Sequence, residues 1–350
     1  MKIALLTIWH EYNYGAELQA YATVKILEKL GHHVEMIDIR LSDQNKKSFK
    51  KRIVNGIQEI SPYHQKFNSF WRKYIPTTKR YHTIHDIISN PPEGDCYIVG
   101  SDQVWNPDIT KRFSLLFFLN FGNDSVKRIS YASSFGVSKW IHHELTNEIK
   151  KLLLRFNRCS CRENSGIEIL EKNFGLKAHH VLDPTLLLGN YEELTGKIKE
   201  KKTLAYYPLA NDKELENIAK HLGYELNLKP IDINRKQYLY KHIVWNRPGI
   251  EQWVRSIAES QFVITRSFHG LAFSLIYKRQ FAIVAVRNDR NIRILNLLED
   301  LGLENRFFSS IEELKQKRPW EDVIDYDIVE KKLFVLRNNS VIFLKEALQL

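Results

Sequence analysis

Residues 261–276 read QFVITRSFHGLAFSLI, and this segment joins a short apolar strand to an apolar helix. The run from Phe262 to Thr265 has the length and composition of a buried strand, and Ser267 is a residue type that caps the first turn of a helix. Free backbone N–H groups, the positive end of a helix dipole, a cation and an imidazole together suit a phosphate or carboxylate ligand. The alternative is an ordinary strand–helix unit with a surface histidine. The candidate ligand-binding residues of this segment are Arg266, Ser267, His269 and Gly270.

Around this segment the chain alternates strand-like and helix-like stretches without internal repeats, which predicts parallel, doubly wound sheets of the α/β class. The first half contains expected strands at 2–8, 33–39, 96–100, 115–121 and 128–133, and expected helices at 15–30 and 142–156. They form a predicted N-terminal Rossmann-like domain over residues 1–196, with a basic helical excursion at about 43–90. A chain of 350 residues favours two domains over a single core.

A lysine-rich linker at 197–202 separates the second set of expected elements. Strands are predicted at 203–207, 224–229, 262–265 and 281–286, and helices at 211–222, 250–259 and 267–277. They form a predicted C-terminal Rossmann-like domain over residues 203–325. The last segment, 326–350, is a predicted helix and a candidate to pack back on the first domain.

Polar residues follow three expected strands of the first domain. Because the carboxyl ends of parallel strands meet at one edge of a sheet, we expect these residues to share one ligand-binding rim. The candidates on this rim are Glu11, Asn13, Gly15, Ser101, Asp102, Gln103, Ser133 and Ser134.

The composition indicates a soluble globular protein, because 43% of the residues are hydrophobic and no run of eighteen apolar residues occurs. The apolar start, residues 1–8, breaks before a cleavage-site pattern and predicts a strand rather than a signal peptide. Three cysteines make no disulfide framework, which favours a reducing cytoplasm. Cys159 and Cys161 have no second pair spaced to complete a zinc site.

The net charge of +11 is concentrated between Lys46 and Arg80, where ten Lys or Arg stand against one acid, Glu59. Interleaved aromatic and aliphatic residues make this segment a candidate for an anionic membrane surface or a phosphate-bearing substrate. A solvated helix with a basic outer face is the alternative. No nucleic-acid-binding module accompanies the basic residues, so we expect no nucleic acid partner.

Five segments, in order, resemble the polysaccharide pyruvyl transferase family. They are NYGAELQAYA at 13–22, VGSDQVWNP at 99–107, SYASSFG at 130–136, Arg162-Glu163 followed by VLDPT at 181–185, and RSFHG at 266–270. The last is similar to the family's Thr-Asp-Ser-Phe-His-Gly signature, with Arg266 where many members carry Asp. The resemblance spans roughly residues 1–306.

This resemblance implies transfer of pyruvate from phosphoenolpyruvate to two hydroxyls of a sugar in a surface or exopolysaccharide precursor, forming a ketal and releasing phosphate. It also implies a GT-B-like pair of Rossmann-like domains facing across a cleft, with the acceptor on the first and the donor on the second. Phosphoenolpyruvate would be a donor substrate, and no cofactor or metal is expected. The acceptor would be a lipid-linked or polymeric saccharide at the inner face of the plasma membrane.

Candidate roles follow from the reaction. His269 would protonate the donor or contact its phosphate, and Arg266 would bind phosphate or carboxylate bidentately or make a salt bridge across the cleft. Asp102 is the candidate base for an acceptor hydroxyl, or a helix cap, and Gln103 would bind sugar hydroxyls together with Asn13 and Glu11. Arg162 would approach the donor or form a structural ion pair. The group Arg287, Arg290 and Arg293 would complete an anion cradle.

Some features of the sequence favour structure over chemistry. Trp105 and Tyr131 are candidates to stack on a sugar or to fill the core. Asp183-Pro184-Thr185 predicts a structural turn, and Asp325-Tyr326-Asp327 a loop or helix cap rather than a metal-binding motif. Known phosphate-loop, dinucleotide, zinc-protease and serine-elbow motifs are absent. Two alternatives stay open, a GT-B nucleotide-sugar glycosyltransferase and a non-catalytic relative, and the oligomeric state is undetermined.

Overall fold

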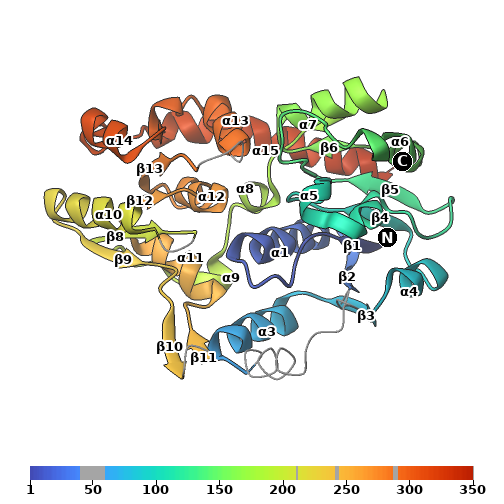
Figure 1. Ribbon diagram of the computed structural model, residues 1–350, viewed down its shortest axis with the longest axis horizontal. Helices are drawn as coiled ribbons and strands as arrows, with labels where there is room; N and C mark the ends of the chain where they lie inside the picture. The colour runs from blue at the N-terminus through green and yellow to red at the C-terminus, as the bar shows by residue number, and fades with distance from the viewer. Residues whose placement is uncertain (40–59, 210–211, 241–243, 287–290, 350) are drawn as a thin grey trace. The chain divides into compact units, whose positions relative to one another are not determined.

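The computed structural model describes residues 1–39, 60–209, 212–240, 244–286 and 291–349. Its contacts divide the chain into two compact units, each with its own parallel sheet (Figure 1). Unit 1 comprises Met1–Phe49, Ser69–Leu188 and Val335–Leu350, and unit 2 comprises Lys50–Asn68 and Gly189–Phe334.

The sheet of unit 1 has five parallel strands in the order β3-β2-β1-β4-β5. They are β1 (Lys2–Leu6), β2 (His33–Ile39), β3 (Thr77–Tyr81), β4 (Cys96–Val99) and β5 (Lys127–Ser130). The central strands β1 and β4 are almost continuously apolar because both faces of a parallel sheet are covered. A small parallel pair, β6 (Ser160–Cys161) and β7 (His179–His180), continues this unit through a bridge from Ser133 to Cys161.

The helices of unit 1 cover this sheet. The long helix α1 (Tyr14–Lys29) follows β1 and packs on α8 (Pro184–Leu188). The others are α4 (Ile84–Ser89), α5 (Pro107–Thr110), the 3₁₀ segment η1 (Lys111–Phe118), η2 (His143–Leu145), α6 (Thr146–Leu153), α7 (Asn164–Ile169) and a π-helical turn, Leu170–Phe174. Two further helices, α3 (Pro62–Tyr74) and α15 (Tyr326–Gln349), contribute residues to both units.

The sheet of unit 2 is also parallel, in the order β14-β13-β12-β8-β9. Its strands are β8 (Thr203–Tyr207), β9 (Lys229–Asp232), β12 (Phe262–Thr265), β13 (Gln280–Val284) and β14 (Phe307–Phe308). An antiparallel hairpin, β10 (Gln237–Tyr240) with β11 (Val244–Asn246), lies outside the sheet (Figure 1). The helices are α9 (Glu192–Thr195), α10 (Lys213–Glu225), α11 (Ile250–Glu259), α12 (Phe268–Ile276), α13 (Ile292–Leu301) and α14 (Ile311–Lys317), with 3₁₀ turns at Glu304–Arg306 and Pro319–Glu321.

Helix α11 shows why these segments form helices. Ile250, Trp253, Val254 and Ile257 recur at helical spacing, and all four are fully buried. Trp253 packs edge-on against Phe273 of α12, which anchors the two helices to each other. Burying a large apolar side chain contributes roughly 2–3 kcal/mol, so this face holds α11 in place.

The α/β class with parallel sheets is confirmed, and so are the strands at 33–39, 203–207 and 262–265 and the helix at 250–259. The strand expected at 115–121 is wrong, because Lys111–Phe118 forms a 3₁₀ helix. A short buried apolar run does not distinguish strand from helix by its pattern alone. The strand expected at 224–229 is also wrong, since α10 continues to Glu225 and β9 starts at Lys229.

Part of the basic Lys46–Arg80 segment lies outside the described residues, including Lys46 to Arg52. Within the described part, Phe67, Phe70 and Trp71 of α3 are buried, so these aromatic side chains belong to the core. Lys66 donates to Asn246 Oδ1 and to the carbonyl of Arg247, both at 2.8 Å. Among the helices that the structure describes, none combines the length and apolar character needed to cross a bilayer.

The second half of α15 packs within unit 1. Arg337 donates to the carbonyl of Leu186, and Ser340 accepts from the backbone N–H of Leu182 at 2.9 Å. At the other end of the helix, Asp325 Oδ1 accepts from the backbone N–H groups of Asp327 and Ile328. The Asp-Tyr-Asp triplet therefore caps a helix, as its sequence indicated.

Candidate active site

The turn between β12 and α12 is built as the sequence predicts. Ser267 is the N-cap of α12, and its Oγ accepts from the backbone N–H of Gly270. A Cβ at Gly270 would lie 2.7 Å from the Thr265 side chain, so only glycine allows α12 to pack this closely on β12. Gly270 thus serves the packing of the site, and its predicted ligand contact stays a prediction.

His269 lies in the first turn of α12, at the carboxyl edge of the unit 2 sheet. It is 8% exposed, and its ring meets the Phe268 ring edge-on with centroids 5.3 Å apart. The Arg293 guanidinium lies over the same Phe268 ring, 5.8 Å from the ring centroid. The structure therefore brings His269 and Arg293 to the same helix N-terminus, while Arg287 and Arg290 lie outside the described residues.

Arg266 is bound by unit 2 itself. Its Nε donates to Asp212 Oδ2 at 2.7 Å, its Nη2 lies 3.4 Å from Glu214, and its Nη1 donates to the carbonyl of Ala285. Asp212 also caps α10 through its other oxygen. The sequence predicts that this guanidinium either binds a ligand or makes a salt bridge, and in the structure it joins the ends of β12 and β13 to the start of α10. Its salt bridge lies within unit 2.

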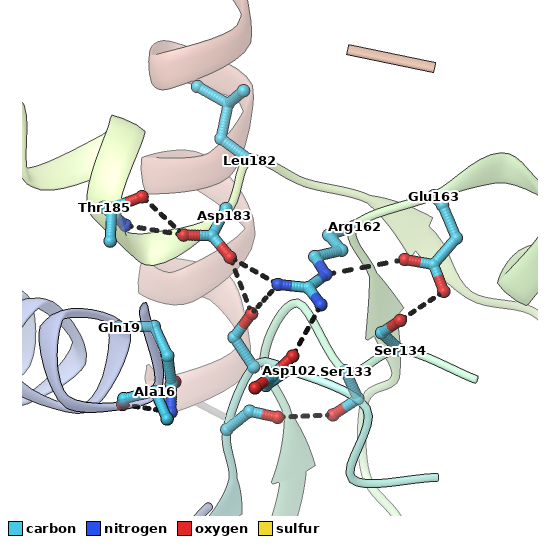
Figure 2. A network of polar contacts seen from close by, with 12 residues as sticks. Ala16, Gln19, Asp102, Ser133, Ser134, Arg162, Glu163, Leu182, Asp183 and Thr185 are labelled. Carbon is cyan, nitrogen blue, oxygen red and sulfur yellow. Dashed lines mark hydrogen bonds and ion pairs between the residues drawn. The ribbon is translucent and has the colours of Figure 1, made fainter. Parts of the chain in front are cut away.

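A buried ion cluster occupies the corresponding edge of the unit 1 sheet (Figure 2). Arg162 donates to Asp183 Oδ2 at 2.8 Å and to Asp102 Oδ1 at 3.0 Å, and its Nε lies 3.7 Å from Glu163. Burial opposes the charge of Arg162, but Asp102, Asp183 and Glu163 outweigh it and raise the pKa of the guanidinium. The sequence predicts that Arg162 either approaches the donor or forms a structural ion pair. Because its side chain is only 1% exposed, the structure favours the ion pair.

Serine side chains and glycines frame this cluster. Glu163 accepts from Ser134 Oγ at 2.7 Å and from the backbone N–H of Phe135 at 3.1 Å. Ser101 Oγ donates to Asp183, and Ser133 Oγ donates to the carbonyl of Gly100. The three predicted ligand-binding serines, Ser101, Ser133 and Ser134, are fully buried and bond the protein. They position the rim rather than line it.

Asp102 is the acid of this cluster that reaches the surface. Its side chain is 18% exposed, whereas the side chains of Asp183 and Glu163 are fully buried. The helix that follows, α5, is capped by Asn106, so Asp102 does not fill the capping role considered from the sequence. Gln103 packs against Gly136 and accepts from Asn106 at 3.2 Å, which places it in the same loop.

The loop from β1 to α1 supplies the remaining predicted residues. Asn13 caps α1 by accepting from the backbone N–H groups of Gly15 and Ala16. Glu11 is exposed, and its backbone N–H donates to Glu17 Oε1 at 3.0 Å. Asn13 and Gly15 therefore order the loop, and Glu11 and Asn13 are both exposed on it.

One acid of this edge, Glu17, is not among the residues predicted from the sequence. Glu17 is fully buried, and its carboxylate also accepts from the Trp71 indole at 2.6 Å. Burial raises the pKa of Glu17 to about 8, against hydrogen bonds that lower it. The sequence contains a sign of this burial, since the residues next to Glu17 in the predicted helix are apolar. Asp183, interpreted as part of a structural turn, belongs to the ion cluster.

Backbone strain gathers at this edge. His10, Tyr12, Asp102 and Ala132 all have positive φ without being glycine, and they follow the ends of β1, β4 and β5. Such conformations are costly and often accompany functional sites. Trp105 and Tyr131, by contrast, are fully buried, so the structure assigns both to the core and not to sugar stacking.

A sequence profile described as polysaccharide pyruvyl transferase matches residues 13–288, which include both strand-end sites. The chain belongs to the polysaccharide pyruvyl transferase family. Comparison with curated proteins returns no match. In the described part of this family member, no three His, Cys, Asp or Glu side chains are grouped to hold a metal ion.

Solved structures share the fold of this pyruvyl transferase family member. UDP-N-acetylglucosamine 2-epimerase from Rickettsia bellii has a TM-score of 0.53 at 10% identity and covers 98% of each chain. UGT89C1 of Arabidopsis thaliana has a TM-score of 0.51 at 10% identity and covers 99% of each chain. At this identity the likeness extends to the fold alone, and it confirms the GT-B-like α/β class.

Proposed function

We propose that the protein transfers pyruvate from phosphoenolpyruvate to a sugar of a surface or exopolysaccharide precursor, forming a cyclic ketal and releasing phosphate. The observation that carries the proposal is the family match over residues 13–288 together with His269 in the first turn of α12. The reaction begins when a proton adds to the methylene carbon of the donor and an acceptor hydroxyl adds to C2. A second hydroxyl then displaces phosphate from C2. Of the two hydroxyl protons released, one replaces the proton that was added to the methylene carbon and the other leaves with phosphate, so the atoms balance and no redox step is needed.

The unit 2 edge supplies the donor side of this proposal. The donor carries a phosphate and a carboxylate, and a helix N-terminus stabilises anions. Imidazole is the side chain whose unperturbed pKa lies closest to neutral pH, which suits His269 to protonate the enol carbon or to bind phosphate. Arg293 adds positive charge beside the same turn. Arg266 orders the turn through Asp212, and the proposed donor contacts are His269 and Arg293.

The unit 1 edge supplies the acceptor side. Asp102 is the proposed base, because its carboxylate reaches the surface while Arg162 holds it in place. Glu11, exposed on the neighbouring loop, is a proposed hydrogen-bond acceptor for sugar hydroxyls. The acceptor would be lipid-linked or polymeric, and the enzyme would work in the cytoplasm, with the Lys46–Arg80 segment contacting the anionic inner face of the membrane.

Calorimetric titration tests the donor. Purified protein is titrated with phosphoenolpyruvate, UDP and GDP-sugars, using wild type, His269→Ala and His221→Ala. His221 lies on α10, with about half of its side chain exposed, and serves as the matched control. We expect phosphoenolpyruvate binding that is lost in His269→Ala and kept in His221→Ala. Preference for a nucleotide would move the protein to the glycosyltransferases, and binding of neither would favour a non-catalytic relative.

A further inference from the structure

A pocket of about 330 Å³ opens at the carboxyl edge of the unit 1 sheet. This volume lies within the range of small-molecule sites. Its walls are the ends of β1 and β2, helix α5 and the 3₁₀ segment η1. Most of the lining residues are apolar, whereas polar and apolar atoms contribute about equally to the pocket surface. The apolar wall residues include Ile8, Trp9, Ile37, Ile109, Phe113 and Phe117. We call this cavity the Trp9 pocket.

The hydroxyl groups in the lining of the Trp9 pocket are already engaged by the protein. Thr7 Oγ1 donates to the carbonyl of Ser101 at 2.7 Å and accepts from Gln19 Nε2 at 3.0 Å. Thr110 Oγ1 donates to the carbonyl of Asn106 at 2.9 Å. These threonines therefore contact a ligand in the pocket mainly through their methyl groups.

Glu11 is the charged residue of the lining. Its side chain is exposed, and its backbone N–H is held by the buried carboxylate of Glu17 at 3.0 Å. A carboxylate accepts hydrogen bonds and donates none, so it selects a ligand with an N–H or O–H group. Among the described lining residues, the Trp9 pocket thus combines several apolar side chains with one carboxyl acceptor, Glu11.

We propose that the Trp9 pocket binds an acceptor sugar that carries an apolar substituent, with Glu11 accepting a hydrogen bond from the adjacent N–H or O–H. An acetamido group and the methyl group of a 6-deoxy sugar share this chemistry. A ring that places a hydroxyl against the apolar side chains of the pocket would leave that hydroxyl without a partner there, which costs binding free energy. The inference rests on the proposed function, since it names the acceptor class of that reaction.

The position of the pocket fits an acceptor site. Thr7 lines the pocket and bonds the carbonyl of Ser101, the residue before the proposed base Asp102. Both the Trp9 pocket and Asp102 belong to unit 1 and to the same carboxyl edge of its sheet. A sugar anchored through its apolar substituent would therefore present its hydroxyls beside the loop that carries the base.

Binding of simple glycosides tests the inference without the donor. Methyl glycosides of a hexose, of its 2-acetamido analogue and of a 6-deoxy hexose are titrated into the full-length protein and followed by ligand-observed NMR. We expect one of the two substituted sugars to bind about tenfold tighter than the plain hexose, a difference that one buried apolar group supplies. The stronger of the two identifies the substituent. Equal affinities for all three would overturn the inference.

Variants place the binding in the pocket. Ile109 lies in the lining and is 43% exposed, so Ile109→Trp should obstruct the pocket and weaken binding about tenfold. Ile88 on α4 is 46% exposed and outside the lining, so Ile88→Trp should leave binding unchanged. Glu11→Gln should weaken binding with the fold preserved, checked by circular dichroism. Unchanged binding in Ile109→Trp, or displacement of the sugar by a short prenyl phosphate, would overturn the proposal.

The two proposals fail separately. If the protein turns over phosphoenolpyruvate but binds the sugar equally well with and without Ile109→Trp, only the proposal of an acceptor site in the Trp9 pocket is refuted. If the sugar binds in the pocket but phosphoenolpyruvate does not bind, only the proposal that phosphoenolpyruvate is the donor is refuted.

Discussion

Arg162 Nη2 lies 3.0 Å from Asp102 Oδ1, so a buried guanidinium holds the one acid of its cluster that reaches the surface. The other face of Arg162 is taken by Asp183 at 2.8 Å. A single arginine therefore sets the position of the proposed base while it neutralises acids that cannot reach water. Removing it would leave these carboxylates to repel one another in a buried site.

Arg162→Ala should lower the free energy of unfolding by about 3–5 kcal/mol, because removal of one partner leaves uncompensated buried charges. Urea unfolding measures the effect. The matched control is Arg80→Ala, which breaks a pair with Asp38 in which the arginine side chain is 54% exposed. That change should cost no more than about 1 kcal/mol. Equal losses in both variants would contradict the description of a buried cluster.

Arg266→Asp should destabilise unit 2, because it places a third acid beside Asp212 and Glu214. The expected loss is about 1–3 kcal/mol, since a charged hydrogen-bonding partner is also removed. Adding Asp212→Asn should recover part of it, as asparagine still caps α10 without the negative charge. Thermal unfolding of the single and double variants gives the comparison. No recovery would mean that Asp212 is not the partner that matters.

Gly270→Ala should also destabilise the site, because the new Cβ would lie 2.7 Å from the Thr265 side chain. Overpacking of this kind costs roughly 1–3 kcal/mol. Gly249→Ala is the control, since its Cβ would be 3.5 Å from its nearest neighbour. Urea unfolding of both variants measures the difference. A Gly270→Ala protein as stable as the control would show that α12 can move away from β12 at little cost.

The pH dependence of stability should carry a contribution from Glu17. Its pKa is raised from an ordinary 4.5 to about 8, so the folded protein holds a proton that the unfolded chain releases. Stability from this group is complete below pH 4.5 and is lost as the pH rises through about 8. Glu17→Gln should flatten the fall in unfolding free energy between these values, measured by urea unfolding in a pH series. The exposed Glu144→Gln should retain the wild-type slope, and retention of that slope in Glu17→Gln would refute the assignment.

Local sequence patterns were sufficient to predict the role of a residue whose hydrogen-bond partners lie in the same turn. Ser267 caps α12 and Asn13 caps α1, as their residue types indicate. The roles of Arg162 and Arg266 were harder to predict, because their partners Asp102 and Asp212 are more than fifty residues away. A guanidinium binds a ligand and a protein carboxylate equally well, and a sequence does not show which of the two it meets.

Local spacing and motif order in the sequence were enough to predict the α/β class, most of the strands and helices, the family and the strand–turn–helix that carries His269, although the strands expected at 115–121 and 224–229 were wrong. Only the tertiary structure decided which polar residues face outward. It buried Ser101, Ser133, Ser134 and Arg162 and left Asp102 and Glu11 at the edge of the sheet. The physical reason is that burial and ion pairing depend on which strand ends meet, and the order of the strands in a sheet is not their order in the chain.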